Sequence, residues 1–269
     1  MTNFLFWNIN HQPLQVQIAN LARAEDVDVI ILAESSLIPS EVMNSLNKSG
    51  AAYRRMRILC EHIELYARFD QKFLKPIQEE NRFGVYRLSL PLCEEILLVA
   101  GHLESKRDQS SESQALDATE VAWTIREVEA REGTSNTILV GDLNMNPFEM
   151  GLVGATAFNA VMDRRIAARE SRVVHRREYP FFYNPMWSLM GDLSPGPPGT
   201  HYRGTAEQAN CFWNMYDQVL LRPGLISRFD PARLKILEGD SAGSFLGHLG
   251  HPHVSDHLPI CFTLRLEVV

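Results

Sequence analysis

Polar side chains follow three apolar runs of this sequence, each at the point where the run ends. Asn8, Glu34 and Asp142 come directly after such runs. Ligands of layered α/β folds bind where strands end, because the loops at that edge are free to shape a pocket. One polar residue in this position is more often a turn former or a helix cap than a ligand. Three of them in order are stronger evidence of a shared site than any one of them alone.

Two short segments add the groups that acid–base chemistry needs. In the first, Gly141 permits a tight turn, Asp142 supplies a carboxylate, and Asn144 has an amide that can donate to a phosphate. In the second, Asp256 and His257 place an acid and an imidazole just before the last apolar run. An imidazole exchanges protons near neutral pH, so these segments predict proton transfer beside a bound anion.

These motifs give the chain its resemblance to the endonuclease/exonuclease/phosphatase family, which includes deoxyribonuclease I, apurinic endonucleases, sphingomyelinases and inositol-polyphosphate phosphatases. The resemblance spans nearly the whole chain. It implies a four-layer α/β sandwich of two packed mixed β-sheets flanked by helices, in a single domain over residues 1–269. The motifs occur in family order: Phe6-Trp7-Asn8, Leu32-Ala33-Glu34, Gly101-His102-Leu103, Gly141-Asp142-Leu143-Asn144, Tyr216-Asp217-Gln218-Val219-Leu220 and Ser255-Asp256-His257.

The resemblance implies a metal centre and an attacking water. Glu34, Asp256 and Asn8 are similar to the family's metal-site residues and would hold Mg²⁺ or Mn²⁺ as Lewis acid and template. Asp142 would orient and deprotonate the water. The expected reaction is hydrolysis of a phosphoester.

The remaining matched residues are expected to contact the phosphate. His102 looks like the family's phosphate-contacting histidine, and Asn144 would hold the phosphate beside it. Asp217 resembles the aspartate that orients the catalytic histidine, here His257. A carboxylate at one ring nitrogen fixes the tautomer and favours the imidazolium, so His257 would donate to a phosphate oxygen or exchange a proton.

Charge and length limit the kind of substrate contact. The 269 residues carry 26 Lys and Arg against 33 Asp and Glu, a net charge of −7. This balance argues against a broad basic clamp for nucleic acid, although not against metal-dependent capture of phosphate at one focused site. The start of the chain resembles no signal peptide, and the four cysteines are scattered. We therefore expect a cytoplasmic, bacterial protein without a membrane anchor or a protein partner.

An α/β layered fold would position these groups, because short apolar runs alternate with segments of helical periodicity. Helices are expected over Gln12–Arg23, from about Pro39, and over Ser111–Arg131, where Ser111 and Gln114 have capping-box spacing. Strands are expected at Phe4–Asn8, Val27–Ala33, Ala52–Ile58, Ile63–Arg68, Phe83–Ser89, Ile96–His102, Thr137–Val140, Tyr216–Leu221 and Leu258–Leu266.

Six arginines lie between positions 164 and 177. If residues 159–172 form a helix, Arg165, Arg169 and Arg172 share one face, which is either a solvated surface or a patch for a phosphate backbone. On the second interpretation Arg176 and Arg177 would contact the substrate.

Aromatic residues cluster just upstream of Asp217. Most are expected in the core, but Tyr183, Trp187 and Trp213 flank predicted loops and are candidates for stacking on a base. Four histidines between His248 and His257 raise zinc as an alternative metal. Their spacing does not match a closed structural zinc site, and we favour a Gly/His-rich loop over the active site.

The favoured function is a Mg²⁺- or Mn²⁺-dependent phosphodiesterase or nuclease that cleaves nucleic acid or nucleotides. The wording around Asp217 departs from the tryptophan-cysteine-aspartate-arginine motif typical of inositol phosphatases. Two alternatives stay open: a hydrolase of a small phosphorylated metabolite or phospholipid headgroup, and a catalytically silent binding module. The intact set of polar residues speaks against the silent module.

Overall fold

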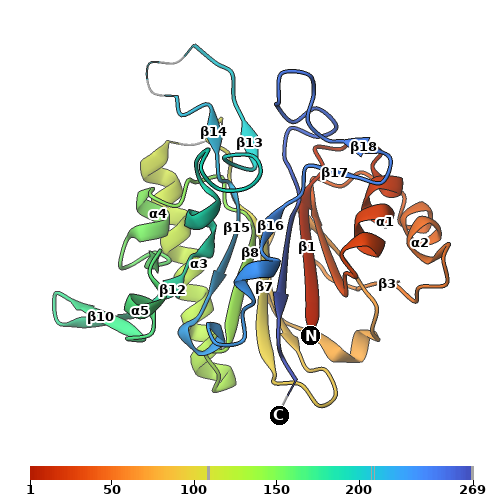
Figure 1. The fold of residues 1–269 in the computed structure, drawn as a ribbon. Coiled ribbons are helices and arrows are strands. Elements are labelled where there is room, and N and C mark those ends of the chain that lie inside the picture. The colour runs from red at the N-terminus through yellow and green to blue at the C-terminus, as the bar shows by residue number, and fades with distance from the viewer. Residues whose placement is uncertain (108–109, 207, 209, 268–269) are drawn as a thin grey trace.

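The computed structural model describes residues 1–107, 110–206, 208 and 210–267. Within these residues two mixed β-sheets pack face to face, and helices cover both outer faces (Figure 1). The predicted four-layer sandwich is confirmed.

The first sheet, in the described part of the chain, has six strands in the order β16-β19-β1-β2-β4-β3. Strands β1 and β2 are parallel, and the other neighbours are antiparallel. Their bounds are β1 (Thr2–Asn8), β2 (Val29–Ala33), β3 (Arg54–Arg55), β4 (Ile63–Ala67), β16 (Lys235–Ile236) and β19 (Ile260–Leu264).

The second sheet has seven strands among the described residues, in the order β5-β6-β7-β8-β15-β12-β9. Here β7 and β8 are parallel, as are β9 and β12. The bounds are β5 (Leu74–Glu79), β6 (Phe83–Leu88), β7 (Ile96–His102), β8 (Thr137–Asp142), β9 (Ala160–Val161), β12 (Phe182–Tyr183) and β15 (Asp217–Leu221).

Helices and short hairpins complete the layers. Helices α1 (Gln15–Ala24) and α2 (Pro39–Asn47) lie outside the first sheet, and α3 (Ser111–Glu132), α4 (Met150–Val153) and α5 (Arg164–Ala167) lie outside the second (Figure 1). Of the helices described, none has the length and apolar character to cross a membrane. Two-stranded sheets are formed by β10 (Ser171–Val174) with β11 (Arg177–Pro180), β13 (His201–Tyr202) with β14 (Trp213–Asn214), and β17 (Gly239–Asp240) with β18 (Gly243–Ser244); 3₁₀ turns lie at η1 (Gln71–Phe73), η2 (Pro185–Leu189), η3 (Pro223–Leu225) and η4 (Pro231–Arg233).

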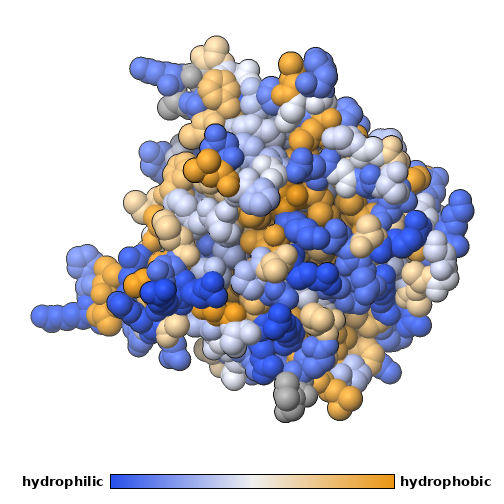
Figure 2. Space-filling view, in the orientation of Figure 1, coloured by the Kyte–Doolittle hydropathy of each residue, from blue (hydrophilic) through white to orange (hydrophobic). Residues whose placement is uncertain are grey.

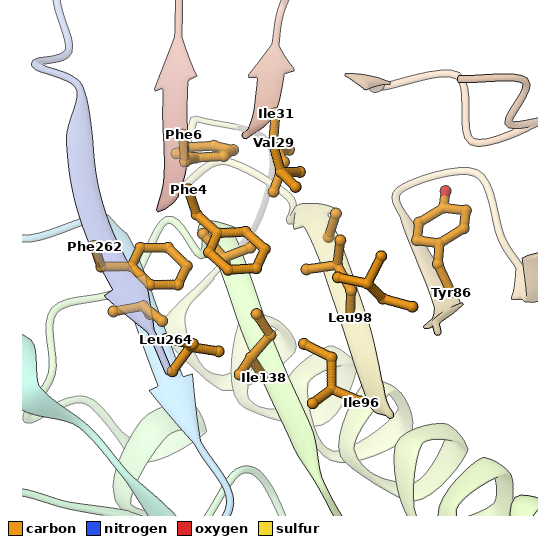
Figure 3. Close-up of a cluster of buried hydrophobic side chains, with 14 of the residues drawn as sticks. Phe4, Phe6, Val29, Ile31, Tyr86, Ile96, Leu98, Ile138, Phe262 and Leu264 are labelled. Atoms are coloured by element: carbon orange, nitrogen blue, oxygen red, sulfur yellow. The ribbon is translucent and has the colours of Figure 1, made fainter. Parts of the chain in front are cut away.

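The core explains why the central strands are continuous apolar runs. Phe4 and Phe6 point from β1 into the space between the sheets, whereas Leu5 and Trp7 point toward the helices. Figure 3 shows Phe4 beside Phe262 of β19, and the two rings stack with centroids 4.9 Å apart. Because both faces of such strands are buried, alternate residues are not polar.

Helix α3 forms as expected but begins differently at its first turn. The side chain of Ser110, not that of Ser111, accepts a hydrogen bond from the Ser113 N–H, so the predicted capping box is wrong. Gln114 turns inward instead, and its amide donates to the carbonyl oxygens of Glu104 and Asn144. This buried amide therefore ties the helix to the loop that carries Asn144.

The arginine-rich stretch is a hairpin rather than the helix considered above. Helix α5 ends at Ala167, and β10 and β11 follow with a two-residue turn at His175 and Arg176. Both turn residues have positive φ angles, 49° and 64°, as a type I′ hairpin turn requires. The adjacent β-branched Val173 and Val174 favour a strand over a helix.

Gly141 lies at the end of β8, where its neighbour in β7 is Gly101. A Cβ atom at Gly141 would lie 1.9 Å from the Gly101 carbonyl oxygen, which is backbone and cannot turn away. We expect Gly141→Ala to destabilise the fold by about 1–3 kcal/mol in urea unfolding, because the strands must shift. The control is Gly247→Ala, whose Cβ would meet nothing closer than 3.6 Å; equal losses in both variants would contradict the steric argument.

Candidate active site

Parallel strands from both sheets deliver four polar residues to one edge of the sandwich. Asn8 and His102 are the last residues of β1 and β7, Asp142 is the last of β8, and Glu34 follows β2. Within each sheet the two strands are parallel, so their carboxyl ends lie side by side. Contacts between β1 and β8 bring the two pairs together across the sandwich.

Antiparallel neighbours begin at the same edge. Asp217, the first residue of β15, lies opposite Asp142 in the register. His257 precedes β19, which pairs with β1. The Trp7 indole N–H donates to the His257 carbonyl oxygen at 2.9 Å, and the Ser255 hydroxyl donates to the Asn8 carbonyl oxygen at 2.9 Å. These bonds hold the segment before β19 against the end of β1.

The centre of the site is a cluster of two carboxylates with an amide and an imidazole. Asn8 Nδ2 donates to Glu34 Oε1 at 3.2 Å and to Asp142 Oδ2 at 3.0 Å. His102 Nε2 lies 3.4 Å and 3.7 Å from the same two oxygens. Glu34 has a φ of 48°, a conformation that costs a non-glycine residue energy and is frequent at functional sites.

Asp142 stays ionised in this interior. Burial alone would raise its pKa, but His257, His102 and the hydrogen bond from Asn8 hold the pKa below its ordinary value. The backbone N–H of Asn144 also donates to Asp142, at 2.9 Å. A buried carboxylate kept in its charged form can accept a proton or attract a cation.

His257 and Asp217 form a buried pair. His257 Nδ1 lies 2.8 Å from Asp217 Oδ2, and the other ring nitrogen, Nε2, lies 3.7 Å from Asp142 Oδ2. Burial opposes the charged ring, yet Asp217, Asp142 and Asp256 together raise the pKa of His257 to about 10. The imidazolium is therefore held between the carboxylates at neutral pH.

Asn144 is held in position by its neighbours. Its φ of 51° turns the chain sharply after Asp142, and its Nδ2 donates to the Leu103 carbonyl oxygen at 2.9 Å. The second amide proton remains available for a ligand, because the residue lines the cavity described next.

Two cavities meet at the carboxylate cluster. Glu34, Ser105 and Arg107 line both. The first, of about 510 Å³, extends past His102 toward His62 and Arg82, and the second has about 520 Å³. The second cavity is lined among others by Asp142, Asn144, His201, Asp256 and His257. A substrate whose phosphate lies at Glu34 thus has room on both sides.

The cations of these cavities are not the predicted ones. Lys106, Arg107 and Arg203 line the second cavity. Arg176 and Arg177 belong to the β10–β11 hairpin, which projects from one side of the sandwich and is mainly hydrophilic (Figures 1 and 2). The structure does not bring these two arginines to the two cavities.

The three predicted stacking aromatics also lie apart from one another. Tyr183 pairs with Leu221, at the end of β15 opposite to Asp217, and packs against the core. Trp187 lies in η2 beside Phe148, with ring centroids 6.3 Å apart. Trp213 packs on Tyr202, which lines the second cavity, with ring centroids 5.5 Å apart.

His201 was not predicted as a site residue. Its ring lies 4.6 Å from that of His257 and stacks on Tyr216 at 5.2 Å. Burial and the neighbouring His257 lower the pKa of His201 to about 4. A backbone bridge between His201 and His257 brings it here from a distant part of the sequence, a pairing that local patterns do not reveal.

The donor set fits a divalent cation. Among the described residues, two groups have ligand atoms within 4.8 Å of one another, namely His201 with Asp256 and His257, and Asp142 with Asp217 and His257. Three of these five residues are aspartates, whose carboxylate oxygens suit Mg²⁺ and Mn²⁺. Asn8 turns its NH₂ toward the carboxylates, while its oxygen accepts the Asn10 N–H at 3.0 Å. In this arrangement the Asn8 NH₂ orders the carboxylates. The Asn8 side-chain oxygen, which would be its metal ligand, faces the Asn10 backbone instead.

Two packed mixed sheets with this set of residues at one edge define a phosphoesterase fold. A family model described as "Endonuclease/Exonuclease/phosphatase family" matches residues 5–257, and the chain belongs to that family, whose enzymes are metal-dependent phosphoesterases. The predicted family membership is therefore confirmed.

Solved structures share the fold at low sequence identity. Similar ones include D. rerio TDP2 complexed with a single-strand DNA product (16% identity, TM-score 0.57, covering 97% of this chain and 98% of that one). The endonuclease domain of TRAS1, a telomere-specific non-LTR retrotransposon, is also similar (16%, 0.56, 99% of both chains). A third is an endonuclease/exonuclease/phosphatase from Beutenbergia cavernae (18%, 0.56, 98% and 71%). No curated protein sequence gives a match.

Proposed function

We propose that this protein is a Mg²⁺- or Mn²⁺-dependent phosphodiesterase that cleaves nucleic acid or nucleotides. One observation carries the proposal: the buried carboxylate cluster lies where two cavities of similar size meet. A phosphodiester has a substituent on each side of the scissile phosphate, and each needs space. A phosphomonoester needs only one of the two cavities.

The residues divide the work between metal binding and proton transfer. Glu34 and Asp256 would hold the divalent ion, which would supply positive charge to the phosphate oxygens, and Asn8 would order the carboxylates through its amide. Asp142 would orient the attacking water and accept its proton, because its lowered pKa keeps it deprotonated at neutral pH and its Oδ2 faces the cluster. A nucleophile generated there would attack a phosphate held over Glu34.

The remaining residues stabilise the phosphate and its leaving group. His257, charged and oriented by Asp217, donates through Nε2 to a phosphate oxygen. His102 and the free amide proton of Asn144 bind the other oxygens. Preorganised donors of this kind stabilise the charge that develops in the transition state, and they need no rearrangement as the reaction proceeds.

Nucleic acid is the favoured substrate on two grounds. A DNA product is bound by one relative of the same fold, and another relative is an endonuclease. In this chain, cationic side chains line the second cavity, and Tyr202, backed by Trp213, forms part of its wall. Cationic and aromatic side chains side by side suit a single strand, whose bases stack while its backbone is neutralised.

A substrate panel tests the proposal. Purified protein with Mg²⁺ or Mn²⁺ is expected to hydrolyse bis-p-nitrophenyl phosphate and at least one of plasmid, single-stranded DNA, RNA or an abasic duplex. Chelation should abolish turnover and added metal should restore it, because the carboxylate cluster alone cannot neutralise the phosphate. Turnover confined to p-nitrophenyl phosphate would reject the diester in favour of a monoester.

A further inference from the structure

The imidazole of His201 lines the second cavity, and 14% of its side chain is exposed. Within the described residues His201 Nδ1 is buried without a partner, and Nε2 lies 4.0 Å from Asp256 Oδ2. That separation is too long for a hydrogen bond. Both residues line the second cavity, so a ligand can reach Nε2 and Oδ2 together.

The distance of 4.0 Å between His201 Nε2 and Asp256 Oδ2 would allow both atoms to bind the same cation. Nitrogen and carboxylate oxygen ligands lie about 2.0–2.2 Å from a divalent transition metal, so two ligands of one ion are about 3–4 Å apart. The position of His201 is fixed by its stack on Tyr216 and by the backbone bridge to His257. Asp256 is partly exposed toward the cavity, with its side chain 41% accessible.

The charges at this edge leave room for a cation. Among the described residues of the site, His257 is the one imidazole with a raised pKa, and it faces carboxylates on more than one side. Four carboxylates gather there, those of Glu34, Asp142, Asp217 and Asp256. Lys106, Arg107 and Arg203 line the same cavity, and a divalent ion at Asp256 would add positive charge directly beside a carboxylate.

We propose that His201 Nε2 and Asp256 Oδ2 together bind a divalent transition-metal ion such as Mn²⁺, and that His201 makes the site discriminate against Mg²⁺. Imidazole nitrogen is a good ligand for transition metals, whereas Mg²⁺ prefers oxygen. Asp256 also belongs to the metal site of the proposed function, and His201 would add a nitrogen to its oxygen ligands. The proposed His201–Asp256 site lies in the cavity of the proposed function, but it requires only that the protein binds the metal ion.

The test is Mn²⁺ binding followed by electron paramagnetic resonance. Free Mn²⁺ is measured in a titration, and pulsed spectra of the bound ion report a nitrogen nucleus in its first coordination sphere. We expect nitrogen coupling in the unmodified protein. His201→Gln should remove that coupling and weaken Mn²⁺ binding about tenfold or more, while Mg²⁺ binding, measured by calorimetry, changes less than threefold.

Matched variants make the result decisive. His251→Gln removes another histidine near the cavity, one that stacks on Tyr202, and should leave the coupling intact. His201→Phe keeps an aromatic ring on Tyr216 but has no ring nitrogen. It should therefore lose the nitrogen coupling and the Mn²⁺ affinity as His201→Gln does. A thermal melt checks that each variant folds.

Three results would overturn the proposal: no Mn²⁺ binding by the unmodified protein, nitrogen coupling that persists in His201→Gln, or equal losses of Mn²⁺ and Mg²⁺ affinity. Failure of the proposed function gives a different result. A protein that binds Mn²⁺ with His201-dependent coupling, yet hydrolyses no phosphodiester, would retain the site and lose the activity.

Discussion

Asp142→Asn is expected to lower kcat for bis-p-nitrophenyl phosphate by about 1,000-fold, because the amide cannot accept a proton from water. That loss corresponds to about 4 kcal/mol of transition-state stabilisation. KM should change much less, since the proposed metal ligands Glu34 and Asp256 are unchanged. The measurement is steady-state hydrolysis at saturating Mn²⁺.

The same substitution is expected to cost stability. The pKa of Asp142 is lowered in the folded protein, so its ionised form stabilises the fold at every pH above the ordinary value of 3.8. An amide has one accepting oxygen and can serve only one of the two donors, Asn8 Nδ2 and the Asn144 N–H, so the lost contact should cost about 1–3 kcal/mol in urea unfolding at neutral pH.

Glu120→Gln is the matched control, because Glu120 is exposed on α3. It should change neither kcat nor stability by a measurable amount. Activity in Asp142→Asn within tenfold of the unmodified protein would exclude Asp142 as the proton acceptor and leave it a purely structural role.

The sequence predicts the central strands well because they are buried on both faces. The run before Glu34, for instance, is apolar throughout, and β2 forms there with all five residues buried. Weak elements are harder to predict. The expected strand at residues 52–58 shortens to Arg54–Arg55, and β5 was not predicted, because its exposed Lys75 and Pro76 break the apolar pattern.

A site residue could be predicted only where it adjoins a strand that is apolar throughout. Asn8 and Asp142 end such strands, so their side chains converge by topology alone. His201 reaches His257 through a bridge across more than fifty positions of the chain. Lys106 and Arg203 lie in loops whose course depends on packing that no local pattern encodes. Arg176 and Arg177 lie on the β10–β11 hairpin, whose direction charge density in the sequence cannot predict, and their contact with substrate stays a prediction.

His257→Ala is expected to lower kcat by about 100- to 10,000-fold, since it removes the donor to the phosphate. It should also destabilise the fold, because Asp217 loses its partner at 2.8 Å and is left as a buried carboxylate. Breaking one member of a buried ion pair costs about 3–5 kcal/mol. Low activity in this variant alone would therefore not separate chemistry from folding.

The double variant D217N/H257Q makes that separation. It removes both charges together, so much of the stability should return, whereas hydrolysis should stay as low as in His257→Ala.

The stability difference between D217N/H257Q and the unmodified protein should also depend on pH. Because the pKa of His257 is raised from 6.5 to about 10 on folding, its contribution is complete below pH 6.5 and is lost as the pH rises toward 10. Urea unfolding in the presence of a chelator, at pH 6.5 and at pH 9.5, measures this difference. Recovery of hydrolysis in the double variant would show that the pair supports the fold, and that another group donates to the phosphate.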